Sequence, residues 1–425
     1  MEAHGWGRYL PSMRATKVLR LILGMKQVRV TGVEICEDGL LVDVAPTTRV
    51  PRCTGCGCRV RDVYDHYRGR RWRHLDLGGM QLTLRYDLRR VDCPRCGVRV
   101  EMVPWAEVGS GFTRQFEDQI ACLAQHANKT LISTLMRIAW TTVGRIISRV
   151  VERQSPDDRL DELTDIGVDE LSYRRHHEYV TVVVDHGSGK VVWAHPGKNA
   201  ETLNTFFRDL NPERCAKLAA VTLDMSQAYI KSVKTNAPNA QLVFDRFHVQ
   251  KLAHDALDEV RRAQVRELGS SEEGRAIKKS RFALQKNPWN LSAIEHQKLA
   301  EVQVTNRPLY RAYLLKETLA AVLSGRQVNV ARDKLTDWLG WASRSKLPPF
   351  VKAAKTIRKY ATGILAYVQT GLSNGRSEGI NGKIRAITRR AYGFHSAQSL
   401  IGLIFLCCSL PALMPVRVYP NLHPL

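Results

Sequence analysis

Two periodicities of apolar and polar residues divide the chain. Strict alternation predicts half-buried β-strands, and it occurs in "LLVDVAP" (40–46) and "MQLTLRYDLRRVDC" (80–93). Apolar residues spaced three or four positions apart predict helices. They occur in residues 112–152 and again from about 251 to 372. The pattern therefore predicts strands first and then two helical stretches separated by a different kind of region.

That intervening region, from 166 to about 249, mixes strands and helices. "EYVTVVVDHGSGKVVWAHPG" predicts two strands joined by a glycine turn, and short apolar strands precede Asp169, Asp224 and Asp245. With two helices between them, the order becomes strand, strand, strand, helix, strand, helix, strand. This order is typical of a ribonuclease-H-like core, in which aspartates of the first and fourth strands lie close in space.

The predicted fold is multidomain α+β. It contains an N-terminal zinc ribbon, a helix-turn-helix and a ribonuclease-H-like α/β catalytic core interrupted by an all-helical insertion. The apolar run at 400–410 is half a membrane span long and stops at Pro411, so it predicts a buried helix. The expected parts are an N-terminal segment (1–50), the zinc ribbon (51–105), the helix-turn-helix (112–152), the first part of the core (164–250), the helical insertion (251–372) and the last part of the core (373–425).

The charge of the chain bears on its partners. Of the 425 residues, 64 are Lys or Arg and 41 are Asp or Glu, so the formal net charge is +23. Such an excess favours a polyanion such as DNA, with an acidic membrane surface as the competing partner. The first apolar stretch, "VLRLILGM", is short and interrupted by arginine, which argues against a signal peptide. We therefore expect a cytoplasmic protein that makes no use of a membrane.

Two pairs of cysteines have the spacing of metal ligands. Cys53 and Cys56 form one CxxC pair, and Cys93 and Cys96 form another, each followed by glycine. Each pair presents two thiolates to one tetrahedral Zn²⁺ ion, so one structural zinc is expected, with Cys58 as an alternative ligand and four free buried cysteines as the opposing interpretation. Residues 51–100 also hold twelve arginines and no lysine. Because the guanidinium fork suits phosphate, this region, including Arg70 and Arg71, is expected to contact DNA.

Residues 128–152 predict two short helices separated near Ala139–Thr142. Leu131, Leu135 and Ile138 are expected to face inward on the first helix, and Val143, Ile146, Ile147 and Val150 on the second. The outward positions would then be Thr141, Thr142, Arg145 and Arg149, which are residue types that meet phosphates and base edges in a major groove. A purely structural helix pair would give the same pattern.

Three carboxylates suggest the chemistry. Phosphodiester cleavage and strand transfer use two Mg²⁺ ions roughly 4 Å apart, and Mg²⁺ prefers hard oxygen ligands. Asp169 and Asp224 fit by strand order, and Glu378 is the one carboxylate in the basic segment "SNGRSEGINGKIRAITRRAYGF". We therefore expect these three to bind Mg²⁺, or Mn²⁺. The basic residues expected to hold the DNA backbone around Glu378 are Arg376, Lys383, Arg385, Arg389 and Arg390.

Each carboxylate also has a structural interpretation. Asp169 suits a strand-end cap, Asp224 a helix N-cap, and Glu378 a surface ion pair with Arg376 or Lys383. Asp185 precedes a glycine turn and is expected to serve that turn. The residues expected to support the site are Asp245, Arg246, His248, Asn374 and Asn381.

Together these motifs make the chain resemble a DDE transposase of the ISL3 family of bacterial insertion sequences. The matching pieces are "CTGC…CPRC", the helix-turn-helix, "GVDE", "TLDMSQAY", "VFDRFHV" and "SNGRSEGINGKIRAI…YGF". The resemblance implies that the carboxylates matching Asp169, Asp224 and Glu378 are the catalytic triad. It also implies excision and insertion of an element through attack by a 3′-hydroxyl at its terminal inverted repeats. The N-terminal "MEAHGWGRYLPSMRATK" matches nothing in the family's pattern.

The expected partners follow from this resemblance. They are double-stranded DNA, both the terminal inverted repeats and the target, and a second copy of the chain in a homodimeric active complex. The expected location is the bacterial cytoplasm, in association with the nucleoid. Two alternatives remain open at this point: a zinc-dependent DNA-binding regulator that has lost catalysis, and a ribonuclease-H-like nuclease without strand transfer.

Overall fold

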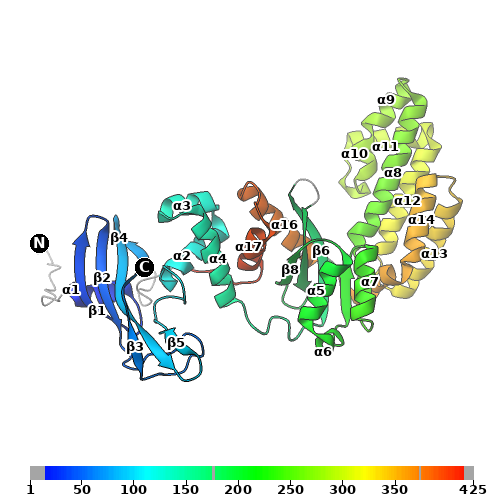
Figure 1. Ribbon diagram of the computed structural model, residues 1–425. Coiled ribbons are helices and arrows are strands. Elements are labelled where there is room, and N and C mark those ends of the chain that lie inside the picture. Colours follow the sequence, from blue (N-terminus) through cyan, green and yellow to red (C-terminus); the bar gives the residue numbers. More distant parts are fainter. Residues whose placement is uncertain (1–14, 175–177, 373–374, 416–425) are drawn as a thin grey trace, which may run out of the picture. The chain divides into compact units, whose positions relative to one another are not determined.

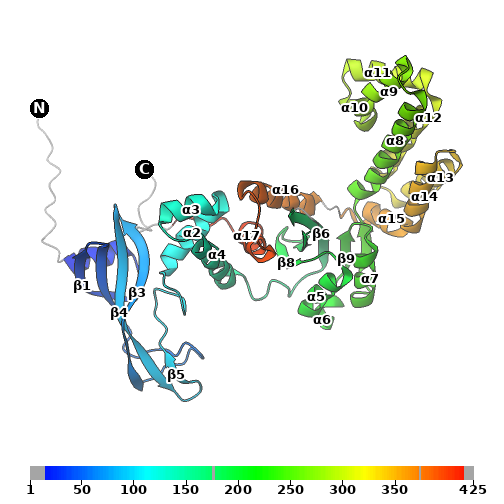
Figure 2. The ribbon, with the colours of Figure 1, turned by 45° about the horizontal axis from the view of Figure 1, so that its top comes forward.

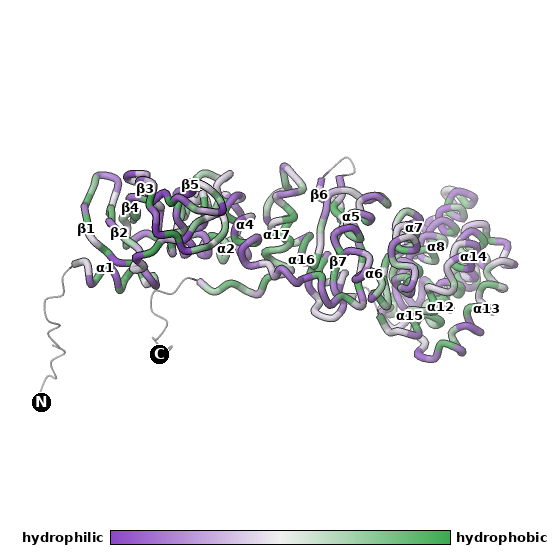
Figure 3. The backbone as a smooth tube through the Cα atoms, turned by 60° about the horizontal axis from the view of Figure 1, so that its bottom comes forward, coloured by the Kyte–Doolittle hydropathy of each residue, from purple (hydrophilic) through white to green (hydrophobic). Residues whose placement is uncertain are grey.

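The computed structural model describes residues 15–174, 178–372 and 375–415 (Figures 1 and 2). The chain divides into two compact units: one comprises Met1–Gln154 and Leu410–Leu425, and the other comprises Ser155–Ser409. We call them the N-terminal unit and the core unit. Apolar and polar positions alternate along the elements of both (Figure 3), as expected for elements with one buried face.

The N-terminal unit is built on a five-stranded sheet. Its strands run in the order β1-β2-β4-β3, with β5 paired to β4, and β2 runs parallel to β4. The sheet therefore crosses the domain boundary expected at residue 50, because the two strands before it join the two long strands after it. Its elements are α1 (Ala15–Leu23), β1 (Val28–Cys36), β2 (Gly39–Pro46), β3 (Val63–Leu77), β4 (Met80–Cys93) and β5 (Gly97–Val100).

Three helices complete this unit: α2 (Arg114–His126), α3 (Lys129–Met136) and α4 (Trp140–Gln154). The side chain of Thr113 caps α2 by accepting from the backbone N–H of Phe116, and Asn128 caps α3 in the same way through Leu131. Arg137, at φ 52°, ends α3 in the left-handed conformation. The predicted break at 139–142 therefore lies slightly earlier, at residues 137–139.

The core unit contains a second five-stranded sheet, in the order β10-β9-β6-β7-β8. β6, β9 and β10 run parallel, whereas β7 is antiparallel to both of its neighbours. The predicted order of strands and helices is confirmed. The elements are β6 (Asp165–Arg174), β7 (Glu178–Asp185), β8 (Val191–Pro196), α5 (Ala200–Leu210), α6 (Pro212–Cys215), β9 (Ala220–Leu223), α7 (Gln227–Asn236) and β10 (Gln241–Phe244).

Helices cover both faces of this sheet. Figure 1 shows α5 and α7 on one side, with α16 (Gly375–Arg390) and α17 (Ala397–Cys408) on the other. Side chains alternate along β6: Ile166 and Val168 join the apolar core with α5 and α7, whereas Gly167 lies against Ser377 of α16. The expected buried helix at 400–410 is α17, whose apolar side chains are largely buried. Among the described helices, none is long and apolar enough to cross a membrane.

Between β10 and α16 the described chain is helical, beginning at Arg246, five residues before the expected start. Long helices α8 and α12 pack together, α14 also packs on α8, and α15 returns to β10. These helices are α8 (Arg246–Leu268), α9 (Glu272–Lys279), α10 (Arg281–Gln285), the 3-10 turn η1 (Pro288–Asn290), α11 (Ala293–Thr305), α12 (Arg307–Leu323), α13 (Val328–Arg344), α14 (Pro348–Lys359) and α15 (Ala361–Thr370).

Candidate functional site

Asp169 lies in the middle of β6, because β6 pairs with β7 as far as Arg174. The expectation that Asp169 ends its strand is therefore wrong. Its carboxylate accepts a hydrogen bond from the backbone N–H of Glu170 at 2.7 Å and another from the side-chain amide of Asn381 on α16. Burial raises the pKa of Asp169, and the nearby charge of Asp224 adds to that rise, whereas the two hydrogen bonds oppose it.

Asp224 follows β9 directly, and β9 runs beside β6 in parallel register, with Gly167 opposite Thr222. Two residues further along each strand come Asp169 and Asp224, which are therefore neighbours at the point where β9 ends beside β6. The side chain of Asp224 accepts from the backbone N–H of Ser226 at 3.0 Å. The predicted proximity of the two aspartates is thus present.

Glu378 comes from the other direction, in the first turn of α16. Gly167 allows the helix to lie close to β6: a Cβ atom there would stand 2.5 Å from Oγ of Ser377. Partial burial raises the pKa of Glu378, the charges of Asp245 and Asp169 raise it further, and His248 opposes them. Glu378 therefore faces the same group of acids.

The three carboxylates do not converge on one point. Among the described residues, only the four cysteines form a group of three or more such side chains with ligand atoms all within 4.8 Å of one another. Two Mg²⁺ ions about 4 Å apart span a longer distance than that, so carboxylates that bind opposite ions need not meet. Burial and neighbouring carboxylates raise the pKa of Asp169 and of Glu378, and no described lysine or arginine forms an ion pair with either.

The supporting residues differ in their contacts. Asp245 follows β10, is buried, and accepts from Nδ1 of His248 at 3.1 Å; this hydrogen bond raises the pKa of His248. Asn381 contacts Asp169 as described above. Arg246 instead donates to Oγ of Ser324 at 3.0 Å in the helical region. Asn374 lies outside the described residues.

The sequence analysis did not identify a further acid near Asp224, which is Glu170. Burial raises the pKa of Glu170, and the charge of Asp224 raises it further; the charge of Lys198 and a hydrogen bond from Tyr229 lower it. Glu170 and Tyr229 both lie inside the quoted motifs "GVDE" and "DMSQAY". Their place in those motifs was the signal that could have identified them. Because side chains alternate along β6, Glu170 points to the face opposite Asp169.

The cysteine cluster is compact. Sγ atoms of Cys53, Cys56, Cys93 and Cys96 all lie within 4.8 Å of one another, and Sγ of Cys56 is 3.5 Å from Sγ of Cys93. The backbone N–H of Gly55 donates to Sγ of Cys53 at 3.3 Å. Thiolates at this spacing fit a tetrahedral Zn²⁺ ion. Cys58, the alternative ligand, is not a member of this group.

The helix pair agrees with its prediction for the apolar residues of α4 but differs from it on α3. Val143, Ile146, Ile147 and Val150 are buried on α4 as expected. On α3, however, Ile132 is buried whereas Leu131 and Leu135 are exposed. An eight-residue helix has too few turns for its apolar spacing to define the inner face. Thr141 and Arg145 are exposed and Thr142 is half-buried.

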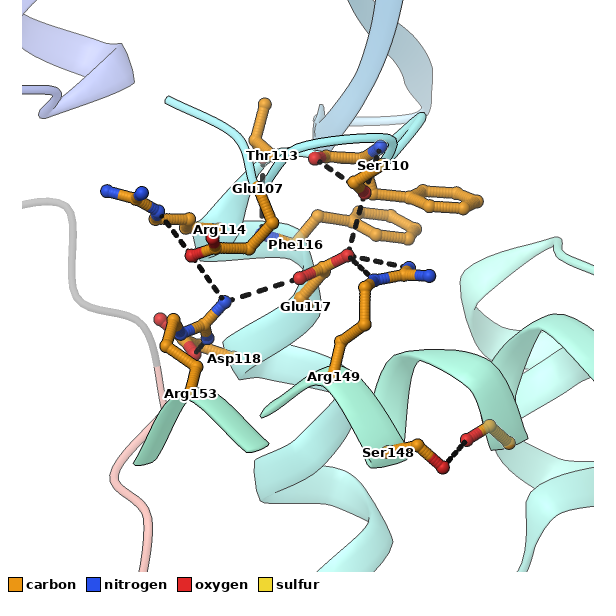
Figure 4. A network of polar contacts seen from close by, with 12 residues as sticks. Glu107, Ser110, Thr113, Arg114, Phe116, Glu117, Asp118, Ser148, Arg149 and Arg153 are labelled. Atoms are coloured by element: carbon orange, nitrogen blue, oxygen red, sulfur yellow. Dashed lines mark hydrogen bonds and ion pairs between the residues drawn. The ribbon is translucent and has the colours of Figure 1, made fainter. Parts of the chain in front are cut away.

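Arg149 points inward, which corrects its expected outward position. It forms an ion pair with Glu117 of α2, with its Nη2 atom 2.7 Å from Oε1, and the Glu117 side chain is fully buried. Glu117 also accepts from Oγ of Ser110 at 2.8 Å and from Arg153 at 3.3 Å (Figure 4). The ion pair neutralises a buried carboxylate and fixes α4 against α2. We call this network the Glu117 cluster.

The other basic residues expected to contact DNA have varied surroundings. Arg71, Arg385 and Arg389 are exposed, and Arg390 is half-buried. Arg70 donates to the carbonyl oxygen of Ser110 at 3.1 Å and lies over Trp72. Arg376 donates to the carbonyl oxygen of Gly187 at 3.1 Å, and Lys383 donates to that of Cys407. Asp185 accepts from the backbone N–H groups of Gly187 and Ser188, which is the turn role expected for it.

Three family models match this chain. A family model described as a transposase, of the ISL3 type, matches residues 166–404. A model described as the helix-turn-helix domain of transposase family ISL3 matches residues 101–151, and one described as the zinc-finger of transposase IS204/IS1001/IS1096/IS1165 matches residues 49–96. The zinc-finger match and the four-cysteine group together support a structural zinc site.

Two curated proteins are similar over nearly the whole chain. The transposase for insertion sequence element IS1557 of Mycobacterium tuberculosis is 40% identical, over 93% of this chain and 96% of its own. The transposase for insertion sequence element IS1001 of Bordetella parapertussis is 30% identical, over 90% of this chain and 95% of its own. The resemblance found in the motifs is confirmed, and the chain belongs to the ISL3 family of transposases.

Proposed function

We propose that this protein binds the terminal inverted repeats of a bacterial insertion sequence, cleaves the DNA there and joins the freed 3′-hydroxyl ends to target DNA. One observation carries the proposal: the register of β6 and β9, together with the packing of α16 on Gly167, supports a grouping of Asp169, Asp224 and Glu378 near the end of β9. The names of its relatives support the same activity.

We interpret the core unit as ribonuclease-H-like, and the antiparallel strand β7 beside the parallel trio β6, β9 and β10 supports this interpretation. We interpret the helices from α8 to α15 as an insertion between the last strand and α16. On this interpretation the inserted helices separate Glu378 from the two aspartates in the sequence. The contact of α15 with β10 brings the chain back to the sheet just before α16.

The residues present fit Mg²⁺ or Mn²⁺. All three candidate ligands are carboxylates, which are the hard oxygen donors these ions prefer. Burial and neighbouring carboxylates raise the pKa of Asp169 and of Glu378, and a bound cation would offset this cost to their charged forms. Two such ions, when bound, activate the attacking oxygen and stabilise the leaving oxygen. Asp169, Asp224 and Glu378 would hold them, with Asn381 fixing the orientation of Asp169.

One exposed side of α16, beginning at Glu378, supplies a path for the DNA backbone. Glu378, Arg385 and Arg389 are spaced seven and four residues apart and are all exposed, so they form one stripe along the helix. Guanidinium groups on that stripe would bind phosphates and hold the scissile bond beside Glu378. His248, which shares a hydrogen bond with Asp245, adds a group that can carry positive charge on the inner side.

Recognition of the element ends falls to the N-terminal unit. In α4, we expect Thr142 and Arg145 to enter a major groove. We expect Arg71 on β3 to contact a phosphate, because its side chain is exposed. Arg149 acts indirectly, by holding α4 through Glu117. We further propose a homodimer, because an element has two ends, and action in the bacterial cytoplasm on nucleoid DNA.

A joining assay separates this proposal from its alternatives. Wild-type protein is mixed with labelled DNA of the element's own end, supercoiled target plasmid and Mg²⁺. Joined end-to-target products support a transposase. Cleaved ends without joined products indicate a nuclease without strand transfer. Specific binding with neither product indicates a DNA-binding regulator, and would overturn the catalytic proposal.

A further inference from the structure

The C-terminal end of α16 carries an unusual residue. The backbone N–H of Tyr392 donates to the carbonyl oxygen of Arg389, and that of Gly393 donates to the carbonyl oxygen of Thr388. These two hydrogen bonds define a Schellman motif. Its first residue beyond the cap requires a left-handed backbone and is usually glycine. Here that position is Tyr392, at φ 55°.

This placement costs backbone strain, because a bulky side chain disfavours positive φ. Gly393, the next residue, also has a positive φ, of 104°. The loop therefore contains a glycine, but not at the position where the Schellman motif usually has one. Packing of the tyrosine ring does not offset this strain, because Tyr392 is 93% exposed. Within this chain, therefore, nothing that the structure describes accounts for an aromatic residue at this position.

The surroundings of Tyr392 indicate its partner. Arg389 lies three residues before it, and Arg385 one further turn back, on the same exposed stripe that begins at Glu378. A large ring at the end of a row of guanidinium groups is the combination that binds nucleic acid, with arginines on phosphates and the ring on a base. The positive charge of these arginines favours a nucleic acid over a second protein chain as the partner of the ring.

We propose that Tyr392 stacks on a nucleobase of the bound element-end DNA, at a step where that base is unstacked from a neighbour. The proposal rests on the proposed function, because it takes the DNA along α16. From Glu378 to Tyr392 is a helical rise of about 20 Å, which corresponds to about six base pairs of duplex. The contacted base is therefore about six base pairs from the scissile bond.

Equilibrium binding of element-end DNA without Mg²⁺ tests the stacking separately from catalysis. Tyr392→Gly and Tyr392→Asn remove the ring but suit a left-handed backbone. Each should weaken binding about 10- to 100-fold, while the melting temperature stays equal to or above that of wild type. Tyr392→Phe keeps the ring and should bind within about twofold of wild type. Phe282→Ala removes another exposed aromatic ring, and should change nothing.

Abasic DNA locates the base. A single abasic site is moved through the element end, and wild type is compared with Tyr392→Gly on each DNA. At the contacted position the two proteins should bind equally, because the ring has lost its partner, whereas elsewhere the difference should persist. A difference that never closes, or Tyr392→Gly binding as tightly as wild type, overturns the proposal.

The remaining outcomes are also decisive. If Tyr392→Gly lowers the oligomeric mass of the protein without DNA, the ring belongs to a protein interface and the stacking proposal falls. If wild type shows the abasic pattern but neither cleaves nor joins in Mg²⁺, the stacking holds and the proposed catalytic function fails. Joining by Tyr392→Gly at wild-type affinity and rate would leave the function standing and remove the stacking.

Discussion

Glu117 in the N-terminal unit and Asp169 in the core unit are both buried acids, yet their partners are opposite in kind. Glu117 pairs with the arginines at 149 and 153 and accepts from Ser110. Asp169 accepts, among the described residues, from two uncharged donors, Glu170 N–H and the Asn381 amide, and has another carboxylate beside it. The first arrangement neutralises a charge inside the protein, whereas the second is the one expected of a candidate metal ligand.

The thiolates and carboxylates repeat this contrast. Four sulfur atoms of the N-terminal unit already converge within 4.8 Å, as a structural metal requires. The candidate catalytic carboxylates are gathered but do not converge. We infer that the buried charged and thiolate groups of the N-terminal unit stabilise its own fold, and that the gathered carboxylates of the core unit serve to bind metal. Substitutions of these groups should therefore destabilise the N-terminal unit, whereas in the core unit they should abolish activity and leave the fold intact.

The largest effect is expected at the cysteines. Cys53→Ser or Cys93→Ser removes a ligand from a zinc site, and binding of structural zinc contributes about 10 kcal/mol or more to small zinc folds. The variants should lose about one zinc ion per chain and the hydrogen-exchange protection of residues 51–100. Metal analysis and exchange mass spectrometry of the full chain measure both. Cys58→Ser is the control and should keep zinc; wild type purified without zinc would contradict the assignment.

The next largest effect concerns activity. Asp169→Asn, Asp224→Asn and Glu378→Gln keep shape but remove a ligand charge. Each should lower cleavage and joining by about 10³-fold or more, equivalent to about 4 kcal/mol of transition-state stabilisation. Binding to element ends should change little, because arginines and lysines carry it.

Two other aspartates are controls for that series. Asp245→Asn should lower activity less, because Asp245 contacts His248, and Asp185→Asn should do little, because it serves a turn. The comparison breaks if Glu378→Gln joins DNA normally while Asp245→Asn is inactive. The third metal ligand would then follow β10, and Glu378 would be a surface charge.

The sequence was sufficient for some of this arrangement and not for the rest. Asp169 and Asp224 could be paired because strand order determines which chain ends meet. The four cysteines could be grouped because their spacing is local. Arg149 could not be placed, because its partner Glu117 lies 32 residues away on a helix whose register the pattern does not reveal. Likewise, only the extent of pairing with β7 shows that Asp169 is in mid-strand.

The Glu117 cluster offers a sharper test of the contrast. Glu117→Gln leaves two arginines beside a buried, uncharged partner, which should destabilise the N-terminal unit by about 3 kcal/mol. Exchange protection of α2 and α4 should fall, while the core unit keeps its protection. Glu201→Gln is the control: it breaks an exposed pair with Arg208, and such pairs contribute about 0–1 kcal/mol. Normal protection combined with lost catalysis would show that Glu117 is functional.

The smallest expected effect is a pH dependence confined to the N-terminal unit. His74 is buried beside the N-cap of α2, with Nδ1 2.8 Å from Oγ1 of Thr113. Burial, and then the charge of Arg73, lower the pKa of His74 to about 4. In the unfolded chain a histidine takes up its proton near pH 6.5. Between pH 6.5 and 4, His74 therefore binds a proton in the unfolded state but not in the folded state.

Stability should accordingly be complete above pH 6.5 and decline as pH falls toward 4, by about 2–3 kcal/mol. Exchange protection of β3 and α2, measured across this range and corrected for intrinsic exchange, reports the loss. His74→Asn does not titrate and should remove this part of the acid sensitivity, whereas His66→Asn, at an exposed position on the same strand, should leave it. A core unit that loses protection over the same range, in step with β3, would mean that the two units unfold together and that the contrast between them does not extend to stability.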